Sequence, residues 1–247
     1  MEFTGIGPGF FVFATIAGFA AFALGSTFGV GGAMLLTAVL LLGMPAPLAV
    51  AVIVPAMLIN SALTFWVHRE HLDPRAAWRV GVMVVPTAIV AALFTDQIDH
   101  SLLQALIGLA IVAALLTQYG LGQKIRVRER GLFAWGVAVG SLGGLCGTAG
   151  PPLALGLRSY GLNGTAFVAT AALIKALLHL PRIPTYARTG LLSGELLPLA
   201  ITLAVMSVAG VWAGKRLLER LDPTRFRGSL DVLLAVLAIL LIAGSLR

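Results

Sequence analysis

The chain has 247 residues, of which 59% are hydrophobic and only 11% charged, and its mean hydropathy is +0.98. A soluble domain of this length needs far more charge to cover its surface, so the composition excludes one and indicates a helical membrane protein. The single cysteine, Cys146, excludes an intramolecular disulfide framework and a cysteine zinc cluster. The net charge of +7 does not indicate nucleic-acid binding, because the Lys and Arg residues lie mostly in short loops between apolar segments.

Apolar segments of about 20 residues, the length that an α-helix needs to cross a bilayer, recur along the whole chain. Residues 1–121 form a first half that begins with a glycine-interrupted segment, and residues 132–247 form a second half with the same order. A basic linker, 122–131, separates the two halves. The elements predicted for the first half are a broken segment over 10–43 and helices over 47–67, 77–94 and 101–120. Those predicted for the second half are a broken segment over 132–159 and helices over 165–181, 193–214 and 228–246.

Glycine and proline interrupt both broken segments. The first contains GSTFGVGGAML (25–35) and the second contains GSLGGLCGTAGPPLAL (140–155). Aligning Gly29–Gly32 with Gly147–Gly150 places both breaks at matching positions, which predicts an internal duplication of about 120 residues. Pro151 and Pro152 suit the first turn of a helix, so a new half-helix is expected to start after each break. The alternative interpretation of these glycines is tight packing between helices.

Loop charge predicts how the two halves are oriented. The loops 68–75 and 122–131 are basic and the loop 95–99 is acidic, so the positive-inside rule places the first two in the cytoplasm and the third outside. The basic cluster at 215–227 also reaches the cytoplasm if 132–159 enters and leaves by one face as a re-entrant helical hairpin. The fold predicted is therefore an all-α polytopic membrane protein with two pseudo-symmetric, inverted repeats, each a broken or re-entrant hairpin plus three transmembrane helices. A broken segment that crosses the membrane is the alternative.

The breaks and one basic helix together predict a mid-membrane anion site. Half-helix N-termini present free N–H groups and the positive end of a dipole. Lys175, His179 and Arg182 share one helix face at spacing i, i+4, i+7, and a lysine midway along a membrane helix costs about 2.5–3.5 kcal/mol unless it faces a cavity or a partner. For Arg182, nearer the helix end, snorkelling to the interface is the alternative. The predicted substrate-binding residues are Lys175, His179, Arg182, Asn60, Ser26, Thr27, Gly29, Gly31, Gly32, Thr148 and Gly150.

The acidic residues and histidines argue against other chemistries. Every Asp and Glu lies in a loop or near a helix end, so the sequence contains no mid-membrane carboxylate relay of the kind that cation coupling needs. Four scattered histidines do not form a catalytic or metal-binding constellation. We therefore expect no catalytic residue, no metal site and no cofactor.

Several short motifs resemble those of the TauE/SafE family of membrane proteins. They are Gly29-Val-Gly-Gly32, the turn Gly43-Met-Pro45, the second glycine–proline break, and the basic stripe that ends in Arg182-Ile-Pro-Thr-Tyr186. The resemblance extends over essentially the whole chain. It implies export of sulfur-containing anions, such as sulfite, sulfoacetate or related organosulfonates, across the bacterial inner membrane. The second break reads GTAGPP rather than the double-glycine form typical of the family, which leaves the identity of the anion open.

The predicted function is that of a multi-pass secondary transporter that exports small sulfur-containing oxyanions by alternating access around the mid-membrane site. Its expected partners are the small anion and the lipid bilayer, with no nucleic acid, and a homodimer is one assembly left open. The alternatives are an anion channel with the same site, a membrane enzyme and a non-transporting membrane subunit. Electrical recordings would identify a channel, which passes far more ions per second than a carrier. Chemically altered substrate would indicate an enzyme, and the absence of anion flux in liposomes would favour a non-transporting subunit.

Overall fold

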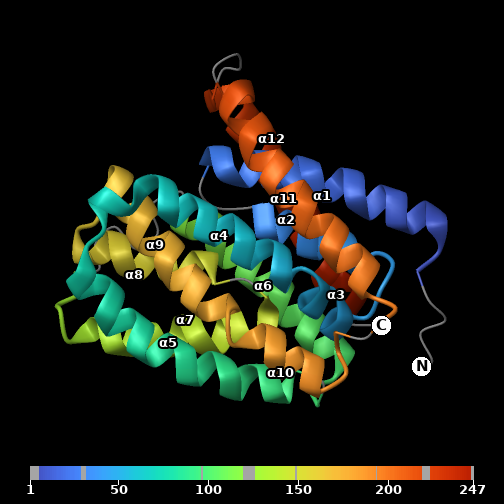
Figure 1. Ribbon diagram of the computed structural model, residues 1–247, viewed down its shortest axis with the longest axis horizontal. Coiled ribbons are helices and arrows are strands. Elements are labelled where there is room, and N and C mark those ends of the chain that lie inside the picture. The colour runs from blue at the N-terminus through green and yellow to red at the C-terminus, as the bar shows by residue number, and fades with distance from the viewer. Residues whose placement is uncertain are drawn as a thin grey trace.

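The computed structural model describes residues 6–28, 32–95, 97–118, 126–147, 149–192, 194–218 and 223–245. Every regular element in these ranges is a helix, and no strand occurs among them (Figure 1). The all-α class predicted from the sequence is confirmed.

The helices follow the two halves of the chain. In the first half they are α1 (Pro8–Phe28), α2 (Gly32–Leu40), α3 (Ala46–Val52), α4 (Val54–His68), the 3-10 turn η1 (Arg69–His71), α5 (Pro74–Phe94) and α6 (His100–Gln118). In the second half they are α7 (Gly131–Cys146), α8 (Gly150–Tyr160), α9 (Gly164–His179), α10 (Arg182–Arg188), α11 (Leu197–Leu218) and α12 (Pro223–Ser245).

Proline shifts several helix boundaries from their predicted positions. The helix expected over 47–67 is interrupted at Ile53, because Pro55 has no N–H to continue the ladder of the preceding turn. The helix expected over 165–181 ends at His179, and Pro181 precedes the separate short helix α10. The helix expected from 193 begins at Leu197 with a proline as its second residue, a favoured place for proline.

The second broken segment is a helical hairpin whose two ends lie together. The amide of Val127, before α7, donates to the carbonyl of Ser159 near the end of α8 at 3.0 Å. Inside the hairpin, a Cβ on Gly156 of α8 would lie 3.0 Å from the Trp135 ring of α7. Gly147, with φ of 75°, ends α7 in the left-handed conformation that glycine adopts freely. The hairpin therefore returns to the end of the molecule from which it starts.

The first broken segment is also a hairpin, and it enters from the opposite end. Gly43, after α2, packs directly on the ring of Phe10 at the start of α1. The amide of Ala46 then donates to Nδ1 of His100 at 3.0 Å, which places this end beside the start of α6. We call the end with residues 68–75, 126–130 and 159–163 the basic end, and the end with residues 43–46, 95–100 and 186–192 the far end. Opposite insertion of the two hairpins is what an inverted repeat requires, while the sequence duplication itself stays a prediction.

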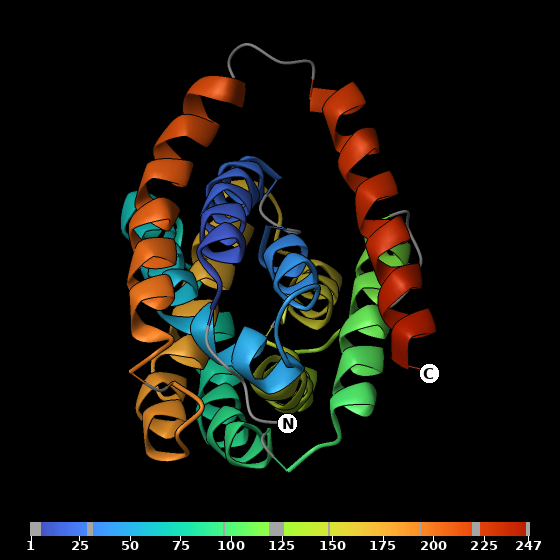
Figure 2. The ribbon, with the colours of Figure 1, turned by 90° about the vertical axis from the view of Figure 1, so that its right-hand side faces the viewer.

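The hairpins pack against long helices of the other half. α1 packs along α11 and α7 packs along α5, while α4 crosses α9 and α6 lies against α12. Figure 2 shows α11 and α12 on opposite flanks, with the α1–α2 hairpin between them. Each hairpin thus packs against a long helix of the other half of the chain.

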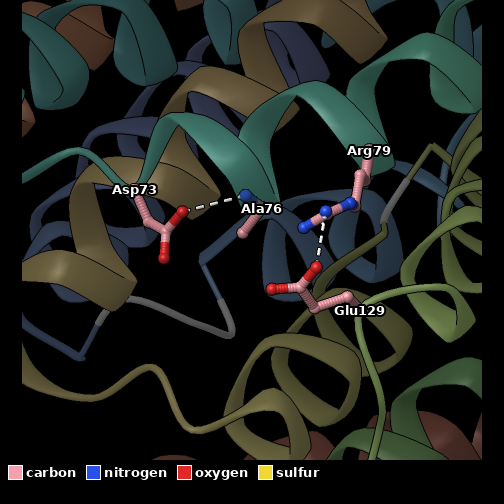
Figure 3. A network of polar contacts seen from close by, with 4 residues as sticks. All are labelled: Asp73, Ala76, Arg79 and Glu129. Atoms are coloured by element: carbon pink, nitrogen blue, oxygen red, sulfur yellow. Dashed lines mark hydrogen bonds and ion pairs between the residues drawn. The ribbon is translucent and has the colours of Figure 1, made fainter.

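Polar contacts fix the basic end of α5 (Figure 3). Asp73 caps the helix, because its Oδ1 accepts from the amide of Ala76 at 2.9 Å. One turn later Arg79 pairs with Glu129, just before α7, at 2.6 Å. The amide of Asp73 also donates to Thr170 of α9 at 3.1 Å. These contacts hold α5, α7 and α9 in register at one end.

Large apolar side chains cover the outside of the bundle. Within the described residues, three helical stretches are long and apolar enough to cross a membrane: 46–71, 74–94 and 164–188. Trp66 and Trp78, which flank the basic loop between α4 and α5, are 65% and 69% exposed. Tryptophans of this kind sit at membrane interfaces, and the guanidinium of Arg69 lies 4.4 Å from the Trp66 ring. The outer surface therefore suits a lipid environment.

Candidate functional site

Arg182, the first residue of α10, lies at the centre of a buried polar cluster. Its side chain is 0% exposed although it is one of the largest in the protein. Nη1 lies 3.2 Å from Nδ1 of His179, and Nη2 donates to the hydroxyl of Tyr186 at 2.8 Å. The guanidinium also lies 5.2 Å from the Tyr186 ring. Full burial excludes the snorkelling alternative for Arg182.

Among the residues that the structure describes, the charge of Arg182 has no acidic partner. In the part of the chain that the structure describes, the only ion pair joins Arg79 to Glu129, at the basic end. Nε of Arg182 is buried without a hydrogen-bond partner. A buried cation without a counter-ion is strongly unfavourable, and a buried donor without an acceptor adds about 1–3 kcal/mol. An anion bound at this cluster would neutralise the guanidinium of Arg182 and accept a hydrogen bond from its Nε.

His179 lies beside Arg182 and is 3% exposed. Because a guanidinium only donates, Nδ1 of His179 is the acceptor of the Arg182 contact, which places the proton of the neutral ring on Nε2. Lys175 lies one helical turn before His179, is half-buried and has no hydrogen-bond or ion-pair partner among the described residues. The three basic side chains thus follow one another from α9 into α10, with Pro181 between the two helices.

A profile of the family described as "Sulfite exporter TauE/SafE" matches residues 14–241. The chain belongs to the TauE/SafE family. No curated protein and no solved structure matches this chain. Family membership makes the protein a membrane transporter of a sulfite-exporting family, in agreement with a buried cation that has no counter-ion among the described residues.

The other predicted site residues of this TauE/SafE protein have no hydrogen bond to the cluster in the described part of the chain, or their side chains lie outside it. Asn60 of α4 is partly exposed, and no hydrogen bond joins its side chain to the described basic residues. Ser26 and Thr27 belong to the last turns of α1, where only the backbone is described. Gly32 begins α2 and is buried. Gly29, Gly31 and Thr148 lie outside the described residues.

The second break offers fewer backbone donors than its position suggests. α8 begins at Gly150, but Pro151 and Pro152 have no N–H, and the amide of Leu153 already donates to the carbonyl of Ala149 at 3.1 Å. Two of the four free donors of a normal helix N-terminus are therefore missing. The backbone of the second break can therefore supply fewer donors to an anion than a normal helix N-terminus does.

Three further residues belong to the cluster and were not predicted as site residues from the sequence: Tyr186, Gly144 and Thr95. The Tyr186 hydroxyl donates to the carbonyl of Gly144 at 3.0 Å and lies 3.5 Å from the hydroxyl of Thr95. Tyr186 was part of the family motif, and its spacing of i, i+4 from Arg182 puts both side chains on one face of α10. Gly144 and Thr95 come from α7 and from the end of α5, so only the folded chain brings them there.

Proposed function

We propose that this protein is a multi-pass transporter of the bacterial inner membrane that exports small sulfur-containing oxyanions, sulfite or organosulfonates, by alternating access. It acts as a carrier and not as an enzyme. The basic residues Arg182, His179 and Lys175 form its substrate site. Family membership supports the substrate class, and the opposed hairpins suit the movement that alternating access needs.

The observation that carries this proposal is the buried guanidinium of Arg182 with its unpartnered Nε. A guanidinium presents donors in a planar fork that matches the oxygens of sulfite or a sulfonate. The anion would neutralise the cation and satisfy Nε at once. His179 and Lys175, on the preceding turns, supply a further hydrogen bond and a further positive charge. The internal repeat, Asn60 and the glycine turns at 29–32 and 147–150 remain further parts of this proposal.

The test is anion binding by Arg182→Gln, with Arg188→Gln as the matched control. Arg188 lies on the same short helix but is exposed, so its variant loses the same charge outside the cluster. Purified protein is screened by thermal shift against sulfite, sulfate, thiosulfate, sulfoacetate and simple carboxylates. Hydrogen bonds to charged groups contribute about 1.5–3 kcal/mol, so we expect Arg182→Gln to bind sulfite or sulfoacetate at least about tenfold more weakly.

The control must bind the same anion as wild type does, and the Arg182→Gln protein must elute as wild type does on gel filtration. Anion efflux from proteoliposomes is measured for the same three proteins, and we expect Arg182→Gln alone to lose it. Wild-type affinity in Arg182→Gln would overturn the assignment of the site. Absence of any sulfur oxyanion among the bound ligands of wild type would overturn the substrate class.

A further inference from the structure

The hydroxyl of Tyr186 joins three elements that are far apart in the chain. It accepts from Nη2 of Arg182 at 2.8 Å and donates to the carbonyl of Gly144 at 3.0 Å. The hydroxyl of Thr95 lies 3.5 Å away and itself reaches the carbonyl of Ala91 at 3.2 Å. Tyr186 is 0% exposed. One hydroxyl thus connects α10, the last turn of α7 and the end of α5.

The carbonyl that Tyr186 reaches belongs to the tip of the α7–α8 hairpin. α7 ends at Cys146, so Gly144 is among the last residues whose carbonyls lack a partner within the helix. These carbonyls carry the negative end of the helix dipole. Tyr186 links the cation of Arg182 to this negative end. The tip of the hairpin therefore takes the place of a counter-ion.

The tip is also closely packed against α5 and α3. A Cβ on Gly144 would lie 3.0 Å from the carbonyl oxygen of Ala88, and a Cβ on Gly147 would lie 3.2 Å from Val50 of α3. The Val50 side chain is apolar and the Ala88 carbonyl is itself an acceptor, so neither donates a hydrogen bond to the last carbonyls of α7. Among the described residues, the carbonyl of Gly144 accepts from the hydroxyl of Tyr186 of α10 at 3.0 Å and, at the longer distance of 3.5 Å, from the hydroxyl of Thr95 after α5, so Tyr186 provides the polar contact of the tip with α10.

We propose that Tyr186 is a latch that couples anion binding to movement of the α7–α8 hairpin. Oxygens of the anion accept from Nη2 of Arg182 in place of the Tyr186 hydroxyl, and from that hydroxyl itself, which then no longer donates to the carbonyl of Gly144. The tip is thereby released from α10. Tyr186 is a positioning residue, since it acts through Arg182 and Gly144. This inference rests on the proposed anion site at Arg182.

Cys146 provides a native reporter for movement of the tip. It is the only cysteine of the chain, it is 0% exposed, and it lies two residues after Gly144. Its thiol can react with N-ethylmaleimide only when the tip moves away from its neighbours. Sulfoacetate is the anion used as probe, because sulfite itself adds to maleimides. A Cys146→Ser protein gives the background of the assay.

The decisive variant is Tyr186→Phe, which keeps the ring but removes the bridging hydroxyl. Without any anion, we expect Cys146 to react about tenfold faster in this variant than in wild type, a factor equivalent to 1.4 kcal/mol. Sulfoacetate should accelerate the reaction in wild type and leave the already fast variant unchanged. Tyr160→Phe, the same substitution on a tyrosine with no hydrogen bond to the described residues, should behave as wild type does.

To distinguish release of the tip from a general loss of stability, each protein is labelled at the same interval below its own unfolding temperature. Wild-type reactivity of Cys146 in anion-free Tyr186→Phe overturns the latch. The latch is also overturned if Cys146 labelling is fast in Tyr186→Phe but sulfoacetate still accelerates it by the same factor as in wild type. Coupling between anion binding and the tip would then not pass through Tyr186. If instead Arg182→Gln binds anions normally, the proposed site fails, while the anion-free labelling still decides whether Tyr186 holds the tip.

Discussion

Lys175 and Arg182 are both cations inside the bundle, but their surroundings differ. Arg182 is fully buried and gives two of its nitrogens to His179 and Tyr186. Lys175 is half-buried and has no such partner in the described part of the chain. A flexible ammonium can follow an anion as it moves, whereas a guanidinium held by two neighbours defines one position for it. We infer that Arg182 sets the place of binding and that Lys175 supplies a second positive charge that binding also requires.

The substitution Lys175→Gln tests whether the charge of Lys175 contributes to anion binding. We expect Lys175→Gln to abolish measurable binding of sulfite or sulfoacetate and to leave folding intact, because it removes a charge but no contact of the described residues. Affinity is measured by thermal shift, and folding by gel filtration. Arg75→Gln, which removes an exposed charge at the basic end, should bind as wild type does. Wild-type affinity in Lys175→Gln would remove this residue from the site.

At the scale of elements, a glycine stripe on α7 decides how closely the hairpin approaches α5. Gly136, Gly140 and Gly144 recur every four residues, so they lie on one face. A Cβ on Gly136 would lie 2.6 Å from the carbonyl oxygen of Val80, and one on Gly140 would lie 2.7 Å from that of Val84. Such small residues allow backbones to meet in membranes, where packing replaces the hydrophobic effect. Tight packing is therefore the role of glycines that precede the break.

A single added methyl group should disturb this interface. In Gly140→Ala the new Cβ meets backbone of α5, which cannot move aside as a side chain can. Overpacking of this kind costs about 1–3 kcal/mol, so we expect a lower unfolding temperature in detergent. Gly9→Ala is the control, because a Cβ on Gly9 meets nothing within 4 Å and alanine favours a helix. Equal unfolding temperatures for the two variants would contradict the close approach of α5 and α7.

At the scale of the molecule, charge and hairpin direction agree on one orientation in the membrane. The basic end carries the arginines of the loops around η1 and before α7, and the α7–α8 hairpin starts there. The far end includes Asp99, whose pKa is lowered by hydrogen bonds from the side chain and amide of Ser101 and the amide of Leu102. A negative charge persists there at neutral pH. From the positive-inside rule, we propose that the basic end faces the cytoplasm.

Cysteines introduced into a Cys146→Ser background test this orientation. Gln97, before α6, and Arg128, before α7, are both exposed and lie at opposite ends. We expect Gln97→Cys to react with a membrane-impermeant maleimide in intact cells, and Arg128→Cys to react only after the cells are permeabilised. The background protein without cysteine should not react at all. The reverse pattern would invert the orientation, and reaction of both in intact cells would place the two loops on one side.

The sequence by itself determined the class of this protein and the position of its breaks, because hydropathy, glycine and proline act locally. It also predicted opposed hairpins, since loop charge reports on which face each segment ends. Burial of Arg182, its link through Tyr186 to Gly144, and the missing counter-ion were decided only by the tertiary structure. These contacts join α5, α7 and α10, whose residues are distant in the chain, and a one-dimensional pattern does not record which polar atoms meet. The same folding that buries Arg182 leaves its Nε without a partner, and this unsatisfied donor is the feature that an anion can complete.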